Sequence, residues 1–394
     1  MDNKRLLDGV RVIDLSTYVA APICGAMLAD LGAEVIHVES PAGDAGRVFM
    51  FPQGKGNIRF DACNSGKKSV TINLQTEEGV QALKALIASA DVFLTNTRMK
   101  SLAKRGLDHE TVCRENPELI YAWISGCGEN GPEANLPAFD SSTYWAKSGL
   151  LIDTMCYTET SYPSVNPTAG GDRVTGLAMF SLIMAALLRR EKTGKGDYVT
   201  TSLFHVGMFQ NAFSIANQQD GYTTPYPRGS ADPEMSAFKC ADGKWVLIAI
   251  MDYPKNGRAL WNAFGMEEMF DKPEFAFPDV WKSRRVEITK LFEEIMIKRP
   301  ANEWIDEFVK RDIACCMLAD SESVQHSEQA WANNYFERYT TETGKEYIIP
   351  RSLIKMESQP LPRIHDVPFV LGEDTVDVLS SLGFGPDEIE KASH

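Results

Sequence analysis

The sequence predicts an α/β fold: an open, mainly parallel β-sheet with helices on both faces. Two observations indicate this fold. Short runs rich in β-branched residues alternate with helical segments, and this alternation continues from about residue 10 to about residue 203. The 394 residues correspond to two or three domains at roughly 150 residues each. The composition, 44% hydrophobic and 24% charged, is that of a globular protein.

The first repeat unit lies near the N-terminus. Val10–Leu15 predicts a strand, Ala20–Gly32 a helix of small residues, and Glu34–Val38 a second strand. Parallel strands need such a crossover helix, so this is a βαβ unit of Rossmann-like type. The turn Ser16–Pro22 lacks the G-x-G-x-x-G pattern that lets backbone approach a pyrophosphate, which argues against a dinucleotide site.

The alternation then continues along the chain. Further strands are expected at Ser69–Leu74, Val92–Thr95, Leu119–Ser125 and Tyr198–Leu203, and helices at Glu77–Ala90, at about His109–Arg114 and at about Thr175–Arg190. Ligands bind such sheets beyond the carboxyl ends of the strands. We therefore expect the segments after Leu15, Leu94 and Ser125 to line the site.

A change in composition suggests the domain organisation. The segment Gly221–Pro233 is rich in Gly, Pro, Tyr and Ser, which is typical of a linker. We expect a large domain over residues 1–225, a smaller inserted α+β domain over 226–330, and a C-terminal segment over 331–394 that returns to the large domain. Beyond the linker, the expected elements are strands at Phe238–Cys240 and Trp245–Met251, helices to about Lys310, and a helix at Asp374–Leu382.

Charge and composition exclude several classes of partner. A net charge of −14 argues against nucleic-acid binding but leaves room for a local basic pocket. The longest nearly apolar run, Val174–Leu188, is shorter than the roughly 20 residues of a membrane span, so it predicts a buried helix and no membrane partner. The N-terminus shows no export signal, and the dispersed cysteines and histidines form no disulfide or metal pattern. These features predict a cytoplasmic protein without a metal site.

Asp172 is the most informative carboxylate. It follows Gly170 and Gly171 and directly precedes the long apolar helix. One interpretation is that Asp172 caps this helix, which spacing alone favours. The other is that it acts as a nucleophile, with free N–H groups at the helix start stabilising an oxyanion and the glycines admitting a bulky substrate.

Two further groups leave the ends of predicted strands. Asp140 follows a loop and is either the N-cap of a helix from Ser141 onward or an active-site carboxylate. Asn96 and Arg98, with Lys104 close behind, form either a solvated basic face or a phosphate contact.

A series of motifs runs through nearly the whole chain. They are LDGVRVIDL (7–15), LADLGAEVIHVESPAGD (28–44), GKKSV (66–70), NPELIY (116–121), GGD (170–172), EKTGKGDYV (191–199) and LGEDTVDVLSSLGF (371–384). In this order they resemble the class III CoA-transferases, the family of formyl-CoA and carnitine CoA-transferases. The resemblance implies a large domain with an inserted smaller one, and two subunits threaded through each other as an interlocked homodimer.

Three segments narrow the resemblance: STYVAAPICG (16–25), TYWAKSGLLID (143–153) and REKTGKGDYVTTSLF (190–204). They are most similar to the clostridial 2-hydroxyacid branch, which includes the 2-hydroxyisocaproate and phenyllactate CoA-transferases of amino-acid fermentation. This implies a 2-hydroxy acid as one substrate.

The resemblance also implies a mechanism. Asp172 corresponds to the family's aspartate nucleophile, which attacks an acyl-CoA thioester to give a mixed anhydride and then an aspartyl-CoA thioester. Acyl-CoA and a carboxylic acid are the substrates, and no permanently bound cofactor or metal is implied. A carboxylate is a weak nucleophile, so positioning and oxyanion donors must assist it.

Other residues match the family position by position. Ala20, Asn96 and Lys104 correspond to CoA-contacting positions, and Arg98 is within reach of a phosphate. Asp140 stands where formyl-CoA transferase has an active-site glutamate. Together these residues would bind CoA and border the reacting carbonyl.

The acyl pocket would be lined by Val19 and Phe139 together with the glycines that precede Asp172. Val19 replaces a glutamine of formyl-CoA transferase, and Ser40 replaces a CoA-contacting arginine. In place of a tetraglycine loop the chain has only 228–230, Arg-Gly-Ser. These departures argue against formyl-CoA and oxalate as substrates.

Three alternatives stand beside this interpretation. An α-methylacyl-CoA racemase shares the fold but uses a histidine as a base at the position of Phe139. The phenyl ring of Phe139 cannot act as a base, which argues against this alternative. A carnitine or bile-acid type CoA-transferase and a non-catalytic CoA-binding protein remain open.

Overall fold

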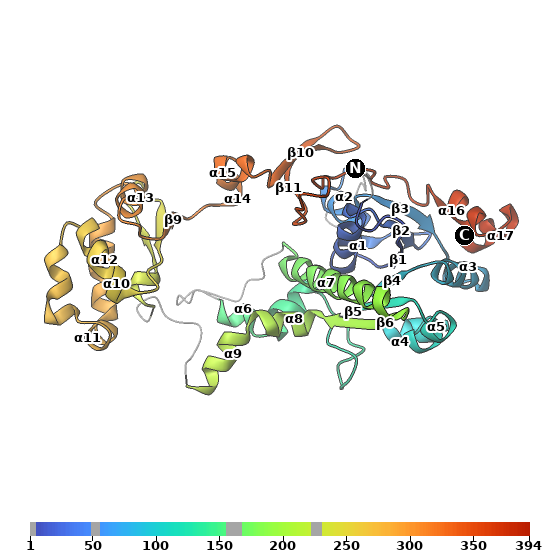
Figure 1. The fold of residues 1–394 in the computed structure, drawn as a ribbon, viewed down its shortest axis with the longest axis horizontal. Helices are drawn as coiled ribbons and strands as arrows, with labels where there is room; N and C mark the ends of the chain where they lie inside the picture. Colours follow the sequence, from blue (N-terminus) through green and yellow to red (C-terminus); the bar gives the residue numbers. More distant parts are fainter. Residues whose placement is uncertain (1–4, 49–55, 155–167, 222–230) are drawn as a thin grey trace. The chain divides into compact units, whose positions relative to one another are not determined.

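The computed structural model describes residues 5–48, 56–154, 168–221 and 231–394 (Figure 1). The chain divides into two compact units. The first comprises Met1–Asp153, Pro163–Gln219 and Trp331–His394, and the second comprises Thr154–Tyr162 and Asp220–Ala330. The expected boundary at 225/226 and most of the expected linker lie outside the described residues.

A six-stranded sheet forms the centre of the first unit. Its strands, in spatial order, are β3 (Lys67–Thr71), β2 (Glu34–Glu39), β1 (Arg11–Leu15), β4 (Val92–Thr95), β5 (Ile120–Ser125) and β6 (Asp197–Ser202). Every neighbouring pair is parallel, which confirms the predicted α/β fold. The chain adds strands outward from β1 on one side and from β4 on the other. The carboxyl ends of β1 and β4 therefore form the switch point where such sheets bind ligands.

Helices cover both faces of this sheet. The helices of the first unit are α1 (Ala20–Asp30), α2 (Ile58–Asn64), α3 (Glu77–Ala88), α4 (Met99–Ala103), α5 (His109–Glu115), α6 (Leu150–Asp153), α7 (Gly170–Thr193), α8 (Leu203–Gln210), α9 (Ala212–Gln219), α16 (Thr375–Ser381) and α17 (Pro386–Ser393). Strand residues alternate between the two faces. Val12 and Leu94 pack in the core that includes α1 and α7, whereas Ile13 and Phe93 pack in the core that includes α3, α16 and α17.

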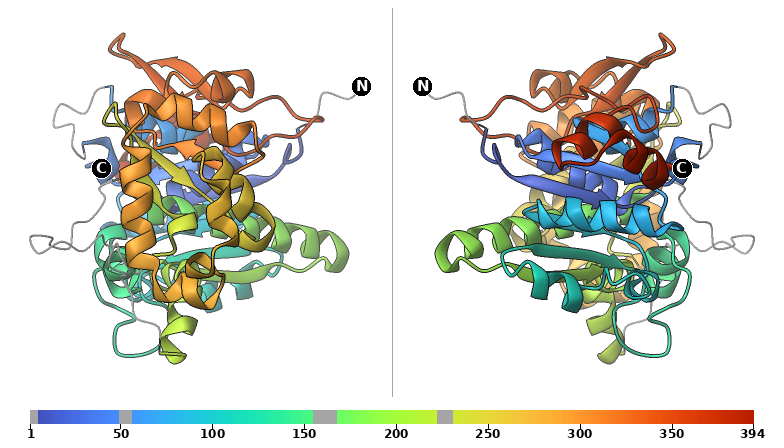
Figure 2. Two further views of the ribbon diagram at one scale, coloured as in Figure 1. Left: turned by 90° about the vertical axis from the view of Figure 1, so that its left-hand side faces the viewer. Right: turned by 90° about the vertical axis from the view of Figure 1, so that its right-hand side faces the viewer.

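The C-terminal segment closes the second of these cores. Figure 1 and the right-hand view of Figure 2 show α16 and α17 beside α3. The backbone N–H of Asn73 donates to the carbonyl of Ala392 at 2.7 Å, and its side-chain amide donates to His394 at 2.7 Å. An antiparallel hairpin, β10 (Phe336–Thr340) and β11 (Glu346–Pro350), precedes these helices.

The second unit combines a small sheet with helices. Strands β7 (Ala237–Lys239), β8 (Trp245–Ile248) and β9 (Cys315–Met317) pair antiparallel. The helices are α10 (Tyr253–Ala263), α11 (Asp279–Ser283), α12 (Arg285–Met296), α13 (Ala301–Val309) and α14 (Ser321–Val324), and α15 (Glu328–Ala332) follows. Trp261, Trp281 and Trp304 are buried in its core, and each indole N–H donates a hydrogen bond at 2.8 Å. Buried aromatic rings with a satisfied polar group account for much of this core.

The long apolar helix predicted at about Thr175–Arg190 extends further at both ends in the structure. It is α7, which begins at Gly170 and ends at Thr193, where Gly194 adopts a left-handed conformation. Among the described helices, α7 is the one long and apolar enough, by length and composition alone, to cross a membrane. It is buried on one face only: Met179 and Ile183 pack into the core with α1, whereas Val174 and Leu188 are exposed. The predicted buried helix is therefore buried on its inner face and exposed on its outer face.

Candidate active site

Asp172 lies in the first turn of α7. The helix begins at Gly170, and its N-cap is Ala169, which has a left-handed φ of 52°. The interpretation of Asp172 as the N-cap is therefore wrong, because the helical backbone starts two residues before it. Its side chain remains available for another role.

Asp140 supplies a carboxylate at the start of the same helix. Its Oδ1 accepts the backbone N–H of Asp172 at 2.9 Å, although the two residues are 32 positions apart. Asp140 is itself the first residue of a π-helical segment, Asp140–Lys147, whose N-cap is Phe139. The prediction of Asp140 as a cap for the helix from Ser141 was therefore wrong. It caps α7 from outside.

This contact bears on the expected oxyanion donors. Free N–H groups at a helix start are natural anion donors. At α7 the N–H of Asp172 is hydrogen-bonded to Asp140, so it is not a free donor.

The two glycines that precede Asp172, Gly170 and Gly171, have different structural roles. A Cβ on Gly171 would lie 2.1 Å from the Tyr144 ring and 2.5 Å from Asp140 Oδ1, so only glycine permits this approach. Gly170 is less constrained, since the nearest atom to its Cβ would be Trp145, at 3.7 Å. Gly171 thus serves the contact between α7 and the Asp140 segment, and Gly170 leaves space at the helix start.

The carboxylates of Asp172 and Asp140 affect each other electrostatically. Burial raises the pKa of Asp172, and the nearby Asp140 raises it further, to about 7, although Arg173 opposes this shift. Burial also raises the pKa of Asp140, while the backbone N–H groups of Asp172 and Gly171 lower it. Two carboxyl groups that share a site resist double ionisation. Asp172 therefore changes charge near neutral pH.

The start of α1 lies next to this site. Ala20 is the first residue of α1 and is buried, and Val19 is the N-cap without a side-chain hydrogen bond. A Cβ on Gly176, one turn after Asp172, would lie 2.5 Å from the carbonyl oxygen of Ala20. The backbone of Ala20 therefore packs against α7 one turn after Asp172.

Asn96 holds the loop that leads to α1. Its side-chain oxygen accepts the N–H of Thr17 at 3.1 Å, and its amide nitrogen donates to the carbonyl of Thr17 at 2.9 Å. This pair ties the end of β4 to the end of β1. Asn96 thus shapes the switch point, and its amide oxygen is already engaged by the protein.

Arg98 and Lys104 form a separate group. Arg98 is the N-cap of α4, Lys104 is its C-cap, and both side chains are exposed. Neither forms an ion pair with another residue that the structure describes. They are cations free to meet phosphates, but no contact joins them to the carboxylate pair.

Sequence reasoning missed Tyr18. Its ring meets the ring of Phe139 edge-on, with centroids 5.8 Å apart, and its backbone has a left-handed φ of 66°. Phe139 is itself 56% exposed. An aromatic residue in the turn after the first strand was the signal that could have identified Tyr18.

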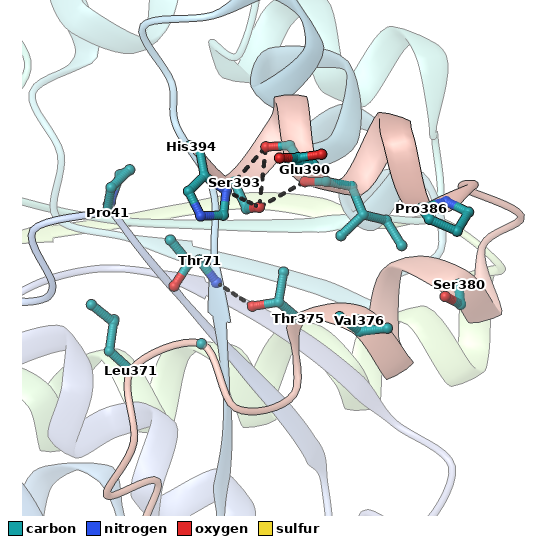
Figure 3. Close-up of a pocket in the computed structure, with 12 residues that line it drawn as sticks. Pro41, Thr71, Leu371, Thr375, Val376, Ser380, Pro386, Glu390, Ser393 and His394 are labelled. Atoms are coloured by element: carbon teal, nitrogen blue, oxygen red, sulfur yellow. Dashed lines mark hydrogen bonds between the residues drawn. The ribbon is translucent and has the colours of Figure 1, made fainter.

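The described residues contain no group of three His, Cys, Asp or Glu side chains that could hold a metal. A cavity of about 520 Å³ lies between the end of β3 and the helices α16 and α17, where the Thr71 N–H donates to Thr375 Oγ1 at 2.9 Å (Figure 3). None of the predicted site residues lines this cavity. The segment 228–230, where a glycine loop was considered, lies outside the described residues.

Comparison with known proteins shows the family of the chain. Residues 7–375 match the model of CoA-transferase family III. The chain is 33% identical to the (R)-2-hydroxy-4-methylpentanoate CoA-transferase of Clostridioides difficile, over 98% of this chain and 97% of the relative. It is also 33% identical to the cinnamoyl-CoA:phenyllactate CoA-transferase of Clostridium sporogenes, over 99% of this chain and 96% of that one.

A solved structure shows the same fold. The crystal structure of Rv3272 from M. tuberculosis superposes with a TM-score of 0.84 at 28% identity, covering 95% of this chain and 99% of that one. The resemblance to class III CoA-transferases, and to their clostridial 2-hydroxyacid branch, is thereby confirmed. Since the family model matches nearly the whole chain, this protein is an enzyme of CoA-transferase family III.

Proposed function

We propose that this enzyme moves CoA from an acyl-CoA thioester to a 2-hydroxy carboxylic acid, with Asp172 as the nucleophile. The observation that carries the proposal is the carboxylate of Asp172 in the first turn of α7, whose pKa is raised to about 7 by burial first and by the neighbouring Asp140 second. A carboxylate with a raised pKa is more basic and hence a better nucleophile once ionised. Gly170, two residues before it, leaves space at the helix start for a thioester to approach.

The first half-reaction would proceed in two steps. A carboxylate oxygen of Asp172 attacks the thioester carbonyl, the C–S bond breaks, and the electron pair leaves with sulfur as CoA thiolate. The thiolate then attacks the Asp172 carbonyl of the mixed anhydride, which forms an aspartyl-CoA thioester and releases the donor acid. The second half-reaction is the reverse sequence with the acceptor acid. No metal or redox step is required for these bonds to balance.

The acceptor class is inferred from the relatives and from the apolar side chains near the site. Both clostridial relatives are named for 2-hydroxy acids, one with a branched aliphatic and one with an aromatic side chain. Val19 and Phe139 provide apolar surface next to the carboxylates. Phe139 also argues against racemase chemistry, because a phenyl ring cannot accept a proton.

CoA itself would be held along the carboxyl edge of the sheet. The exposed cations of Arg98 and Lys104 on α4 suit its phosphates, and the start of α1 at Ala20 suits the pantetheine arm. We further propose an interlocked homodimer in the cytoplasm. Phe209 and Phe213 on α8 and α9 are 79% and 87% exposed and supply apolar surface for a second copy.

The test is a panel assay of CoA exchange. The enzyme is incubated with acetyl-CoA, propionyl-CoA or cinnamoyl-CoA and with lactate, 2-hydroxy-4-methylpentanoate, 3-phenyllactate, oxalate, formate or carnitine. Chromatography then measures each new acyl-CoA. We expect the highest kcat/KM with a 2-hydroxy acid. A preference for oxalate, formate or carnitine over every 2-hydroxy acid would refute the acceptor assignment.

The covalent intermediate is tested separately. The protein is incubated with acyl-CoA, trapped with hydroxylamine or borohydride, and digested for mass spectrometry. We expect the modification on the peptide that contains Asp172. Label on Asp140 instead would refute Asp172 as the nucleophile.

A further inference from the structure

The loop after β1 is held in an unusual conformation. Tyr18 has a left-handed φ of 66°, which is uncommon for a residue other than glycine. Such a conformation persists only where surrounding contacts determine it. The contacts around Tyr18 are therefore informative.

A row of buried charges lies beneath this loop. Asp14 on β1, His37 on β2 and Lys67 on β3 each have side chains that are 0% exposed, and they lie on three adjacent strands. Lys67 Nζ is 2.8 Å from Asp14 Oδ2, and His37 Nδ1 is 3.3 Å from the same oxygen. On its other side, His37 Nε2 is 3.5 Å from Asp44 Oδ2.

The charges in this row balance. Burial alone would lower the pKa of His37, but its ion pairs with Asp14 and Asp44 raise it to about 9, against the opposing charge of Lys67. With His37 protonated, the row contains two carboxylates and two cations. Buried charges are stable only when they are paired in this way.

The row ends on the backbone of Tyr18. Asp44 Oδ1 accepts the N–H of Tyr18 at 3.1 Å and the N–H of Gly46 at 2.8 Å. Ser16 donates its hydroxyl to Asp14, and Thr17 is held by the amide of Asn96. Each of the three loop residues Ser16, Thr17 and Tyr18 thus has an anchoring hydrogen bond.

The anchored loop places the ring of Tyr18 against the ring of Phe139. Its ring is perpendicular to the ring of Phe139 at 5.8 Å. Phe139 directly precedes Asp140, which accepts the N–H of Asp172 at 2.9 Å. The two rings therefore border the site at which the acyl group would react.

We propose that Tyr18 is a specificity-determining residue that forms, with Phe139, an aromatic wall for the side chain of the acid. Asp44, supported by His37, Asp14 and Lys67, is the positioning residue that holds this wall in place. The inference rests on the proposed CoA transfer through Asp172. It adds the residues that select the size of the acid.

The experiment compares acids that differ only in their side chains. Transfer from cinnamoyl-CoA to 3-phenyllactate and to lactate is measured, and the ratio of the two kcat/KM values is the readout. Tyr18→Gly removes the ring while favouring the left-handed backbone, and Tyr18→Phe keeps the ring as the matched control. We expect Tyr18→Gly to change the ratio at least tenfold and Tyr18→Phe to change it less than twofold.

A second variant removes the other ring of the aromatic wall, that of Phe139. Phe139→Ala truncates an exposed ring and should leave folding intact. It is expected to move the ratio in the same direction as Tyr18→Gly. An unchanged ratio in both variants would overturn the proposal.

The positioning role is tested through Asp44. Asp44→Ala removes the acceptor for the Tyr18 N–H and should shift the ratio toward that of Tyr18→Gly, whereas Asp44→Asn keeps an acceptor oxygen and should shift it less. If circular dichroism shows that Asp44→Ala does not fold, His37→Gln takes its place, with a smaller shift expected in the same direction. A folded variant with the wild-type ratio would overturn the positioning role.

The outcomes separate this inference from the proposed function. Asp172→Asn is measured beside the other variants. If Asp172→Asn is inactive while Tyr18→Gly and Phe139→Ala keep the wild-type ratio, only the wall is refuted. If the wild-type enzyme transfers CoA to none of the three 2-hydroxy acids of the panel, both the wall and the 2-hydroxyacid assignment are refuted.

Discussion

Two aspartates of this protein, the buried Asp14 and the half-buried Asp172, have opposite electrostatic surroundings. Asp14, in the row beneath the β1 loop, contacts Lys67 and His37, and these partners outweigh burial and lower its pKa. At Asp172 burial raises the pKa, and the carboxylate of Asp140 raises it further. The paired carboxylate stabilises the fold and positions a loop. The carboxylate near another negative charge is instead more basic than an ordinary aspartate. The charges that surround an aspartate thus decide whether its pKa is lowered or raised.

The largest expected effect is on catalysis at Asp172. Asp172→Asn removes the nucleophilic oxygen and should lower kcat by at least about a thousandfold. The same change should not destabilise the protein at pH 7.5, because a carboxyl group with a raised pKa lowers stability when it ionises. Steady-state kinetics and urea unfolding measure the two effects. If Asp172→Asn stays active, Asp172 is not the nucleophile and its contrast with the structural Asp14 is lost.

At the buried pair of Asp14 and Lys67 we expect a substitution to lower stability. Lys67→Met leaves Asp14 with a weaker set of partners and should cost about 3–5 kcal/mol of unfolding free energy, as when one member of a buried ion pair is removed. The matched control is Lys68→Met, the next residue on β3, whose 46% exposed side chain pairs with Glu34 at 2.7 Å. Its cost should stay below about 1 kcal/mol. Equal costs in urea unfolding would contradict the buried pairing.

The charge of His37 predicts a dependence of stability on pH. Its folded pKa of about 9 lies above the ordinary 6.5, so the fold favours the protonated form. The resulting stabilisation, on the order of 3 kcal/mol, is complete below about pH 6.5 and is lost as the pH rises through about 9. Urea unfolding of wild type and His37→Gln at pH 6, 7.5 and 9 measures it. The difference between them should shrink as the pH rises, and a constant difference would show that His37 is neutral.

The smallest expected effect is on the pKa of Asp172, through its interaction with Asp140. Asp140→Asn keeps an oxygen that accepts the Asp172 N–H but removes the negative charge. The pKa of Asp172, about 7 in the wild type, should fall by about one unit. In the wild type kcat/KM should rise with pH up to about 7, and in the variant this acidic limb should move downward. An unmoved limb would mean that burial alone sets the pKa.

The sequence by itself determined the local elements and the family. The β-branched runs near residues 11–15, 34–38 and 92–95 became parallel strands, because side-chain shape and periodicity act within a few residues. The motif order identified the family for the same reason: it is written along the chain. Helix starts were less certain. The first helical residue of α7 depends on Ala169, whose left-handed backbone carries no signal in residue type.

Only the tertiary structure decided which residues meet. Asp140 reaches the backbone of Asp172 across 32 residues, and Asp14, His37 and Lys67 come together through the order and register of three strands. Composition could not reveal that Asp14 would be paired and Asp172 left beside a carboxylate. A pKa depends on burial and on charges within a few ångströms, and these distances exist only once the chain has packed.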